Sequence, residues 1–234
     1  MTTSLTVLEI VGPWKLVPFF ITCIIFFVLF ANTPASETST PWFYCIVKCL
    51  PIISLMLFVL LHFITTTVNN SYSWHILIGL IFSCLGDAFL VWEKYFKLGA
   101  VCFSISQICY LMAFGWTPFD PYVAIVVFGV GYLGYSYLST SLHGVIRYMV
   151  AAYIAVECTM TWRAVARVQF SDDLASQWTK LSACLGSIAF VISDLKLAID
   201  MFKGPIPYAH VGIMVTYYAA QFGIALSVVE SKAG

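Results

Sequence analysis

Two aspartates lie inside long apolar stretches of this sequence, each directly after a small residue, in Gly86-Asp87 and in Ser193-Asp194. An ionisable side chain near the centre of a bilayer costs about 2.5 to 3.5 kcal/mol on insertion scales, so each needs a chemical or structural reason. Two carboxyl groups can divide the work of acid-catalysed hydrolysis, because one supplies a proton while the other, ionised, stabilises the developing positive charge. Asp87 and Asp194 are therefore the candidate catalytic residues.

The composition places these aspartates in a membrane. Of the 234 residues, 61% are hydrophobic and 9% are charged, and the mean hydropathy is +0.94. A soluble domain carries about 25% charged residues, so this chain cannot cover its surface with polar groups in water. The net charge of zero leaves no basic surface for phosphate backbones, and we expect no nucleic-acid partner.

Eight apolar stretches, each long enough for a membrane-spanning helix, follow one another along the chain between short polar breaks. They are predicted at residues 16–31, 42–64, 74–92, 96–116, 122–139, 145–163, 178–202 and 206–229. The seven tryptophans fall at the ends of these stretches, as is typical of a membrane–water boundary. The sequence predicts an all-α integral membrane protein, a bundle of eight transmembrane helices in a single polytopic domain over residues 1–234.

A shift of 107 residues aligns parts of the two halves of the chain. The matched pairs are Gly79 with Gly186, Asp87 with Asp194, Leu90 with Leu197, and Tyr110 with Tyr217. The shift spans four helices, so the halves, residues 16–116 and 122–229, are predicted to be parallel repeats with a site at their interface. Residues 16–31 also resemble a signal peptide. We expect a retained helix there, because an even number of helices divides into two such halves.

Three of the ionisable residues inside the apolar stretches are predicted to lie at a similar depth in the membrane. Asp87 and Asp194 are each predicted to lie roughly 8 to 12 Å inside the membrane face opposite the termini, and Lys48 reaches the same layer. Glu157 is predicted to lie farther from that face. For each group, the alternative is a structural hydrogen bond or ion pair between helices.

Polar side chains on the neighbouring helices are candidates for binding a substrate or supporting the aspartates. Tyr217 and Gln221 lie one helical turn apart and therefore face the same way. Core packing is the alternative for the tyrosines. The candidate supporting residues are Lys48, Gln107, Tyr110, Glu157, Ser193, Tyr217, Tyr218 and Gln221.

The segments that contain these residues resemble the YhhN-like lysoplasmalogenases, the animal transmembrane protein 86 group. The segments are Lys48-Cys49-Leu50-Pro51, Gly86-Asp87, Phe103 to Tyr110, Ser193-Asp194 and Tyr217-Tyr218-Ala219-Ala220-Gln221. Together they extend the resemblance over most of residues 42–227. One departure is Gln107, where the resemblance implies histidine in many relatives.

The resemblance implies a membrane hydrolase that cleaves the sn-1 vinyl ether bond of a lysophospholipid, a lysoplasmalogen, to a fatty aldehyde and glycerophosphoethanolamine or glycerophosphocholine. Vinyl ethers are cleaved by acid: a proton adds to the β-carbon, and water attacks the resulting oxocarbenium ion. We hypothesise that Asp194 is the acid and Asp87 the ionised partner that stabilises the cation, with the reverse assignment as the alternative. Lys48 would keep the second carboxylate charged or meet the lipid phosphate.

Two other functions are compatible with the sequence. A transporter or binding protein for a small molecule or lipid would also have a polar site between parallel repeats. A metal-dependent hydrolase would need about three His or Asp ligands at one depth. The four histidines form no such cluster in the sequence, so we expect neither a metal nor a cofactor. The endoplasmic reticulum is the expected membrane, and the sequence is compatible with a homodimer.

Overall fold

The computed structural model describes residues 12–31, 33–34, 37–65, 71–168 and 174–232 of the chain. Long helices make up most of this part: α2 (Val17–Phe30), α3 (Pro41–Thr65), α4 (Ser71–Phe89), α5 (Phe96–Phe114), α6 (Pro121–Ser139), α7 (Val145–Ala166), α8 (Leu174–Phe202) and α9 (Ala209–Leu226). Short 3₁₀ helices occupy Pro13–Leu16, Glu93–Tyr95 and Ser227–Lys232, and the described residues contain no β-strand. Each predicted stretch coincides with one long helix, to within a few residues at each end.

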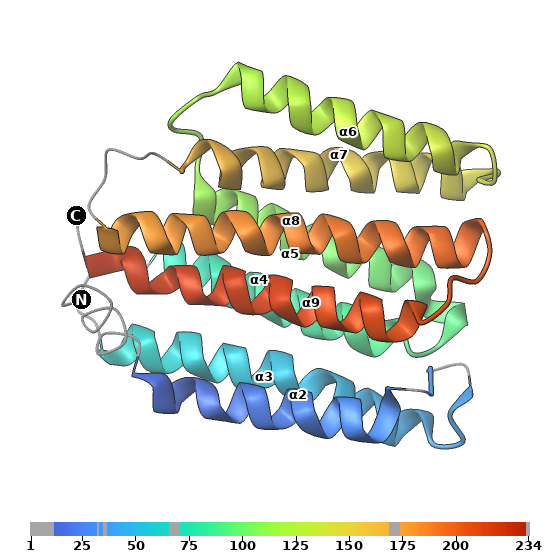
Figure 1. The fold of residues 1–234 in the computed structure, drawn as a ribbon, viewed down its shortest axis with the longest axis horizontal. Coiled ribbons are helices and arrows are strands. Elements are labelled where there is room, and N and C mark those ends of the chain that lie inside the picture. Colours follow the sequence, from blue (N-terminus) through green and yellow to red (C-terminus); the bar gives the residue numbers. More distant parts are fainter. Residues whose placement is uncertain (1–11, 32, 35–36, 66–70, 169–173, 233–234) are drawn as a thin grey trace.

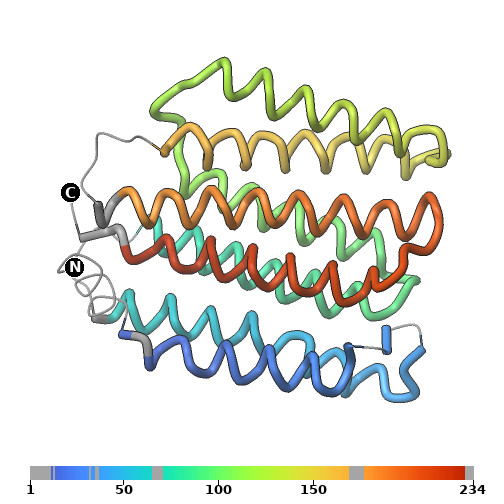
Figure 2. Tube along the Cα trace, in the orientation of Figure 1, coloured from blue at the N-terminus to red at the C-terminus, as the bar shows by residue number. Residues whose placement is uncertain are grey.

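The helices alternate in direction, so that α2 begins and α9 ends at the same end of the bundle (Figures 1 and 2). Six of them, α3, α4, α5, α6, α8 and α9, are long and apolar enough to cross a membrane. The apolar stretch of α2, Trp14–Phe30, is shorter, and α7 is more polar because it carries Arg147, Glu157 and Arg163. The prediction of an all-α membrane protein is confirmed.

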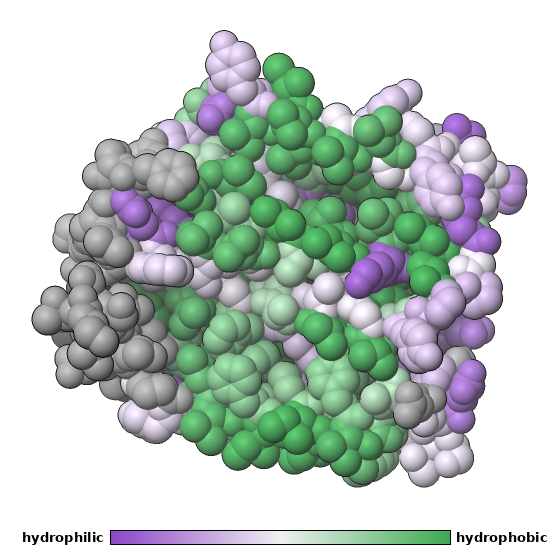
Figure 3. Space-filling model, in the orientation of Figure 1, coloured by the Kyte–Doolittle hydropathy of each residue, from purple (hydrophilic) through white to green (hydrophobic). Residues whose placement is uncertain are grey.

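The outer surface of the bundle is apolar in its middle. On the face shown in Figure 3, hydrophobic side chains cover the central part, and most of the hydrophilic ones lie toward the two ends. Helix α6 exposes large apolar side chains along its length, among them Ile125, Val130 and Leu133. Such a surface is unstable in water and suits contact with lipid chains.

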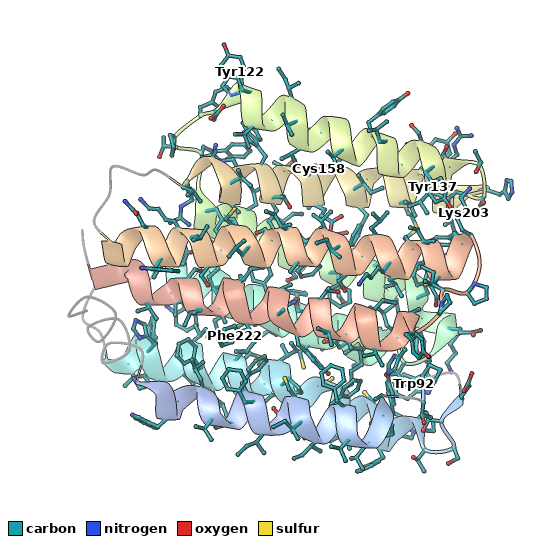
Figure 4. All side chains as sticks on the ribbon, in the orientation of Figure 1. Trp92, Tyr122, Tyr137, Cys158, Lys203 and Phe222 are labelled. Carbon is teal, nitrogen blue, oxygen red and sulfur yellow. The ribbon has the colours of Figure 1, made fainter. Side chains whose placement is uncertain are left out.

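Aromatic side chains gather near the ends of the bundle. Exposed tryptophans near helix ends are Trp14, Trp42, Trp74, Trp116 and Trp178. Trp162 differs from them, because it is buried and donates its indole N–H to the backbone carbonyl of Asp120 at 2.7 Å. At the end opposite the start of α2, the ammonium of Lys203 lies 4.6 Å from the centre of the Tyr137 ring (Figure 4).

Helix α7 connects the outermost helix to the rest of the bundle. The most extensively packed pairs are α8 with α9 and α4 with α5. Helix α7 packs against both α5 and α8, while α6 lies on the outer side and contacts mainly α7 (Figure 1). Helix α3 packs against α4 and α9, and α2 packs against α3. Two three-helix interfaces result, one among α3, α4 and α9 and one among α5, α7 and α8.

Glycines allow the two most closely packed pairs to approach each other. A Cβ added at Gly79 on α4 would overlap the ring of Tyr110 on α5. A Cβ added at Gly186 on α8 would lie 2.8 Å from the carbonyl oxygen of Ala220 and from the amide nitrogen of Ile224, both on α9. Gly79 and Gly186 are matched by the 107-residue shift, so the close approach recurs at corresponding positions of the two halves. The duplication itself stays a prediction.

Replacing Gly186 with alanine should destabilise the protein by about 1–3 kcal/mol, the typical cost of overpacking, because the backbone of α9 cannot move aside. Alanine alone would favour a helix by about 0.5–1 kcal/mol relative to glycine. The matched control is Gly129→Ala on α6, where an added Cβ meets nothing within 4 Å. Thermal unfolding of the purified variants measures both. Equal midpoints for the two variants would contradict the close packing.

Candidate active site

Asp87 lies in a buried ion pair near the end of α4. The Nζ of Lys48, on α3, is 3.2 Å from Oδ1 of Asp87 and 3.5 Å from its backbone carbonyl oxygen. Tyr217, on α9, donates its hydroxyl to Oδ2 of Asp87 at 2.5 Å. All three residues are buried. Both carboxyl oxygens thus face a donor, one of them charged, so this arrangement holds Asp87 as a carboxylate. We call these three residues the Asp87 centre.

Asp194, on α8, lies in a second cluster with residues of α5 and α7. Tyr153 of α7 donates its hydroxyl to Oδ2 of Asp194, and Gln107 of α5 donates its Nε2–H to the oxygen of Tyr153 at 3.0 Å. Glu157, one turn after Tyr153, lies close enough to Asp194 for the two carboxyl groups to interact electrostatically. Glu157 is buried and Asp194 is half-buried. Two neighbouring carboxyl groups in such a site favour sharing one proton, because ionising both would place two like charges side by side. We call these four residues the Asp194 centre.

Glu157 interacts with Asp194 although its position on α7 is farther from the shared end of the bundle than that of Asp194 on α8, as predicted. Side chains lean toward the N-terminal end of their own helix. Because α7 and α8 are antiparallel, Glu157 leans toward the end of the bundle where α7 begins and Asp194 leans the opposite way. Counting residues from the helix ends ignores this lean, which brings the two carboxyl groups together.

The small residue before each aspartate contacts a neighbouring helix. A Cβ on Gly86 would lie 2.7 Å from the ring of Phe103 on α5, so the absence of a side chain admits this ring. Ser193 donates its hydroxyl to the backbone carbonyl of Ile213 on α9 at 3.1 Å. Both residues therefore serve helix packing beside the carboxyl groups.

Three aromatic rings connect the two centres. The ring centres of Phe103, Phe190 and Tyr217 lie 5.8 to 6.2 Å apart. Tyr217 binds Asp87, and Phe190 lies one turn before Asp194 on α8. The bundle thus holds two carboxyl centres of different chemistry on either side of an apolar cluster.

Tyr110 and Gln221 belong to a buried network that is satisfied within itself. Tyr110 donates to Oε1 of Gln221 at 2.7 Å, Nε2 of Gln221 donates to Ser83 at 2.9 Å, and Ser83 lies 2.7 Å from the hydroxyl of Ser106. These side chains come from α4, α5 and α9. The network joins the three helices and includes no hydrogen bond to the carboxyl group of either aspartate.

The structure sorts the predicted supporting residues into different groups. Lys48 and Tyr217 lie at Asp87, while Gln107 and Glu157 lie at Asp194. Tyr218 donates to the backbone carbonyl of Lys48 at 2.9 Å, which ties α9 to α3.

Sequence reasoning missed Tyr153, Ser83 and Ser106. The spacing of Tyr153 and Glu157, one turn apart on α7, was the available signal for the first of them. Across the described ranges, no group of three or more His, Cys, Asp or Glu residues is arranged to hold a metal ion.

Fold and site together define the class of this protein: a polytopic all-α membrane protein with buried carboxyl groups supplied by different helices. The model of the YhhN family matches residues 43–228. The chain belongs to the YhhN family, and the resemblance predicted from its motifs is confirmed.

Curated relatives match over nearly the whole chain. The Bos taurus protein named Lysoplasmalogenase TMEM86A is 40% identical, over 99% of this chain and 95% of its own length. The Homo sapiens protein of that name is 39% identical over the same shares. The Sus scrofa protein named Lysoplasmalogenase TMEM86B is 35% identical, over 94% of this chain and 88% of its own length. No solved structure matches the chain.

Proposed function

We propose that this protein is a membrane hydrolase that cleaves the sn-1 vinyl ether bond of lysoplasmalogens to a fatty aldehyde and glycerophosphoethanolamine or glycerophosphocholine. The names of its relatives support the reaction. The observation that carries the mechanism is the difference between the two carboxyl centres: Asp87 is paired with a lysine, and Asp194 lies beside a second carboxyl group, that of Glu157.

Each centre suits one half of an acid-catalysed cleavage. The pair of Asp194 and Glu157 supplies the proton that adds to the β-carbon of the vinyl ether. Asp87, held as a carboxylate by Lys48 and Tyr217, stabilises the oxocarbenium ion that forms. General acid catalysis of this kind typically contributes about 10²- to 10⁴-fold to a rate. This division agrees with the hypothesis from the sequence that Asp194 takes part in donating the proton and Asp87 is the ionised partner.

The depth of both centres supports a lipid substrate. Asp87 lies two residues before the end of α4, and Asp194 lies eight residues before the end of α8. Both helices end at the same end of the bundle (Figure 1). The sn-1 vinyl ether of a lysophospholipid lies just below its headgroup, so a lipid in that leaflet presents the reacting bond to the end of the bundle at which α4 and α8 end.

The test is an assay with two matched lipids. The purified protein is incubated with a lysoplasmalogen and, separately, with the lysophospholipid that carries an ester at sn-1, and fatty aldehyde is measured. We expect aldehyde from the vinyl ether alone. Free fatty acid from the ester, or lysoplasmalogen that is bound or moved across vesicles yet recovered intact, would contradict the proposal. The endoplasmic reticulum and a homodimer remain predictions of the sequence.

A further inference from the structure

Two buried oxygen atoms of the Asp194 centre have no hydrogen-bond partner among the described residues. They are Oε1 of Gln107 and Oε1 of Glu157. Gln107 is fully buried, and Glu157 is 5% exposed. A buried acceptor left unpaired costs about 1–3 kcal/mol, and native proteins rarely tolerate one without a functional reason.

The orientation of Gln107 follows from the hydrogen bonds around it. Tyr153 has a single hydroxyl hydrogen and donates it to Asp194, so its oxygen can only accept from Gln107. The amide nitrogen of Gln107 must therefore face Tyr153, and its carbonyl oxygen must point elsewhere. Exchanging the two amide atoms would place two acceptors against each other. The unpaired oxygen is thus imposed by the chain of donors that ends at Asp194.

The two unpaired oxygens belong to one connected set of side chains. Gln107 donates to Tyr153, Tyr153 donates to Asp194, and the carboxyl group of Asp194 interacts with that of the neighbouring Glu157. Glu157 is one turn after Tyr153 and faces the same side of α7. A molecule that satisfies two such acceptors needs two hydrogens to donate, and water is the smallest that has them.

We propose that Oε1 of Gln107 and Oε1 of Glu157 hold the water molecule that attacks the substrate, an inference that rests on the proposed hydrolysis. Transfer of the shared proton to the β-carbon leaves Asp194 and Glu157 as two adjacent carboxylates. The water oxygen bonds to the carbon that carries the ether oxygen, and the proton that the water loses goes to Glu157, which restores the shared proton. The hemiacetal then breaks its bond to the glycerol oxygen, which takes the hydroxyl hydrogen, so that aldehyde and alcohol are formed.

Hydrolysis in D₂O tests this water site. In the wild-type protein the water is held in place, so each protonated substrate goes forward and the recovered lysoplasmalogen carries no deuterium at the β-carbon. Gln107→Met removes the acceptor at nearly constant volume. The cation then loses the original hydrogen and returns to the vinyl ether with deuterium in its place. We expect aldehyde release about 10²-fold lower, the scale of a misplaced reactant, and deuterium in the recovered lipid by mass spectrometry.

The matched control is Gln221→Met, which also removes a buried amide. The oxygen of the Gln221 amide accepts from Tyr110, and its nitrogen donates to Ser83. Neither amide atom is hydrogen-bonded to Asp194. We expect this variant to unfold at a lower temperature and to give no deuterium in the recovered lipid. The difference separates loss of the water site from a general loosening of the core.

A second, milder substitution tests the same site if Gln107→Met does not fold. Gln107→Asn keeps an amide but withdraws its oxygen by one methylene, and the same deuterium uptake is expected to a smaller extent. Folded Gln107 variants that show full aldehyde release, or a slower release without deuterium in the recovered lipid, would overturn the water site and leave the hydrolysis standing. A wild-type protein that releases no aldehyde would instead contradict the proposed function.

Discussion

Asp194→Asn is expected to lower the rate of aldehyde release by at least about 10²-fold, within the range attributed to general acid catalysis. Asparagine has nearly the same shape and can still accept the hydroxyl of Tyr153, so the fold should persist. It cannot share an acidic proton with Glu157, so the pair loses its role as acid. The initial rate with a lysoplasmalogen, measured on purified protein, gives the effect.

The control for Asp194→Asn lies on the same helix. Oδ1 of Asp200 accepts the backbone N–H of Ile206 at 2.8 Å, which the side chain of asparagine can also do. Asp200→Asn should therefore release aldehyde at nearly the wild-type rate. Equal rates for Asp194→Asn and Asp200→Asn would rule out Asp194 as part of the acid.

The pair of Lys48 and Asp87 is expected to show the second large effect, on stability and activity together. Breaking a buried ion pair from one side costs about 3–5 kcal/mol, because the remaining charge is left without a partner. Lys48→Met and Asp87→Asn should each lower the unfolding temperature strongly. The double variant contains neither charge and should recover most of the lost stability. It should still release no aldehyde, because the carboxylate that stabilises the cation is gone.

Thermal unfolding and aldehyde release of the two single variants and the double variant separate the two roles of this pair. Lys203→Met serves as the lysine control, since Lys203 contacts Thr140 and the ring of Tyr137 at the end of the bundle, away from both carboxyl centres. A double variant that regains activity would show that Asp87 is not needed for the reaction. One that stays as unstable as the single variants would contradict the ion pair as the source of the loss.

The hydrogen-bond partners of Tyr110 and Gln221 could not be predicted from the sequence. Both were predicted to support the aspartates, because they are polar groups on helices that follow those of Asp87 and Asp194. The structure places them in a closed network with Ser83 and Ser106. A buried amide must find partners, but its sequence position does not say whether those partners are a catalytic group or other structural side chains.

Tyr153, in contrast, was not predicted to belong to the site, yet the structure places it there. In the sequence, its spacing of one turn from Glu157 was a weak signal, because aromatic residues are common along this chain. It became part of the site because α7 packs between α5 and α8, which puts its hydroxyl between Gln107 and Asp194. Contacts of this kind depend on the order of helices around the bundle, and periodicity along one helix does not contain that order.

The sequence by itself determined the membrane class, the helices and the few charges inside them, because the cost of placing a residue in lipid depends on its type and on the length of the apolar stretch around it. It also placed Lys48 and Asp87 in one layer, since depth follows from the rise per residue. Only the tertiary structure decided that Asp87 pairs with Lys48 while Asp194 pairs with Glu157. Partner choice depends on which helices become neighbours and on the direction in which their side chains lean, and packing between distant parts of the chain sets both.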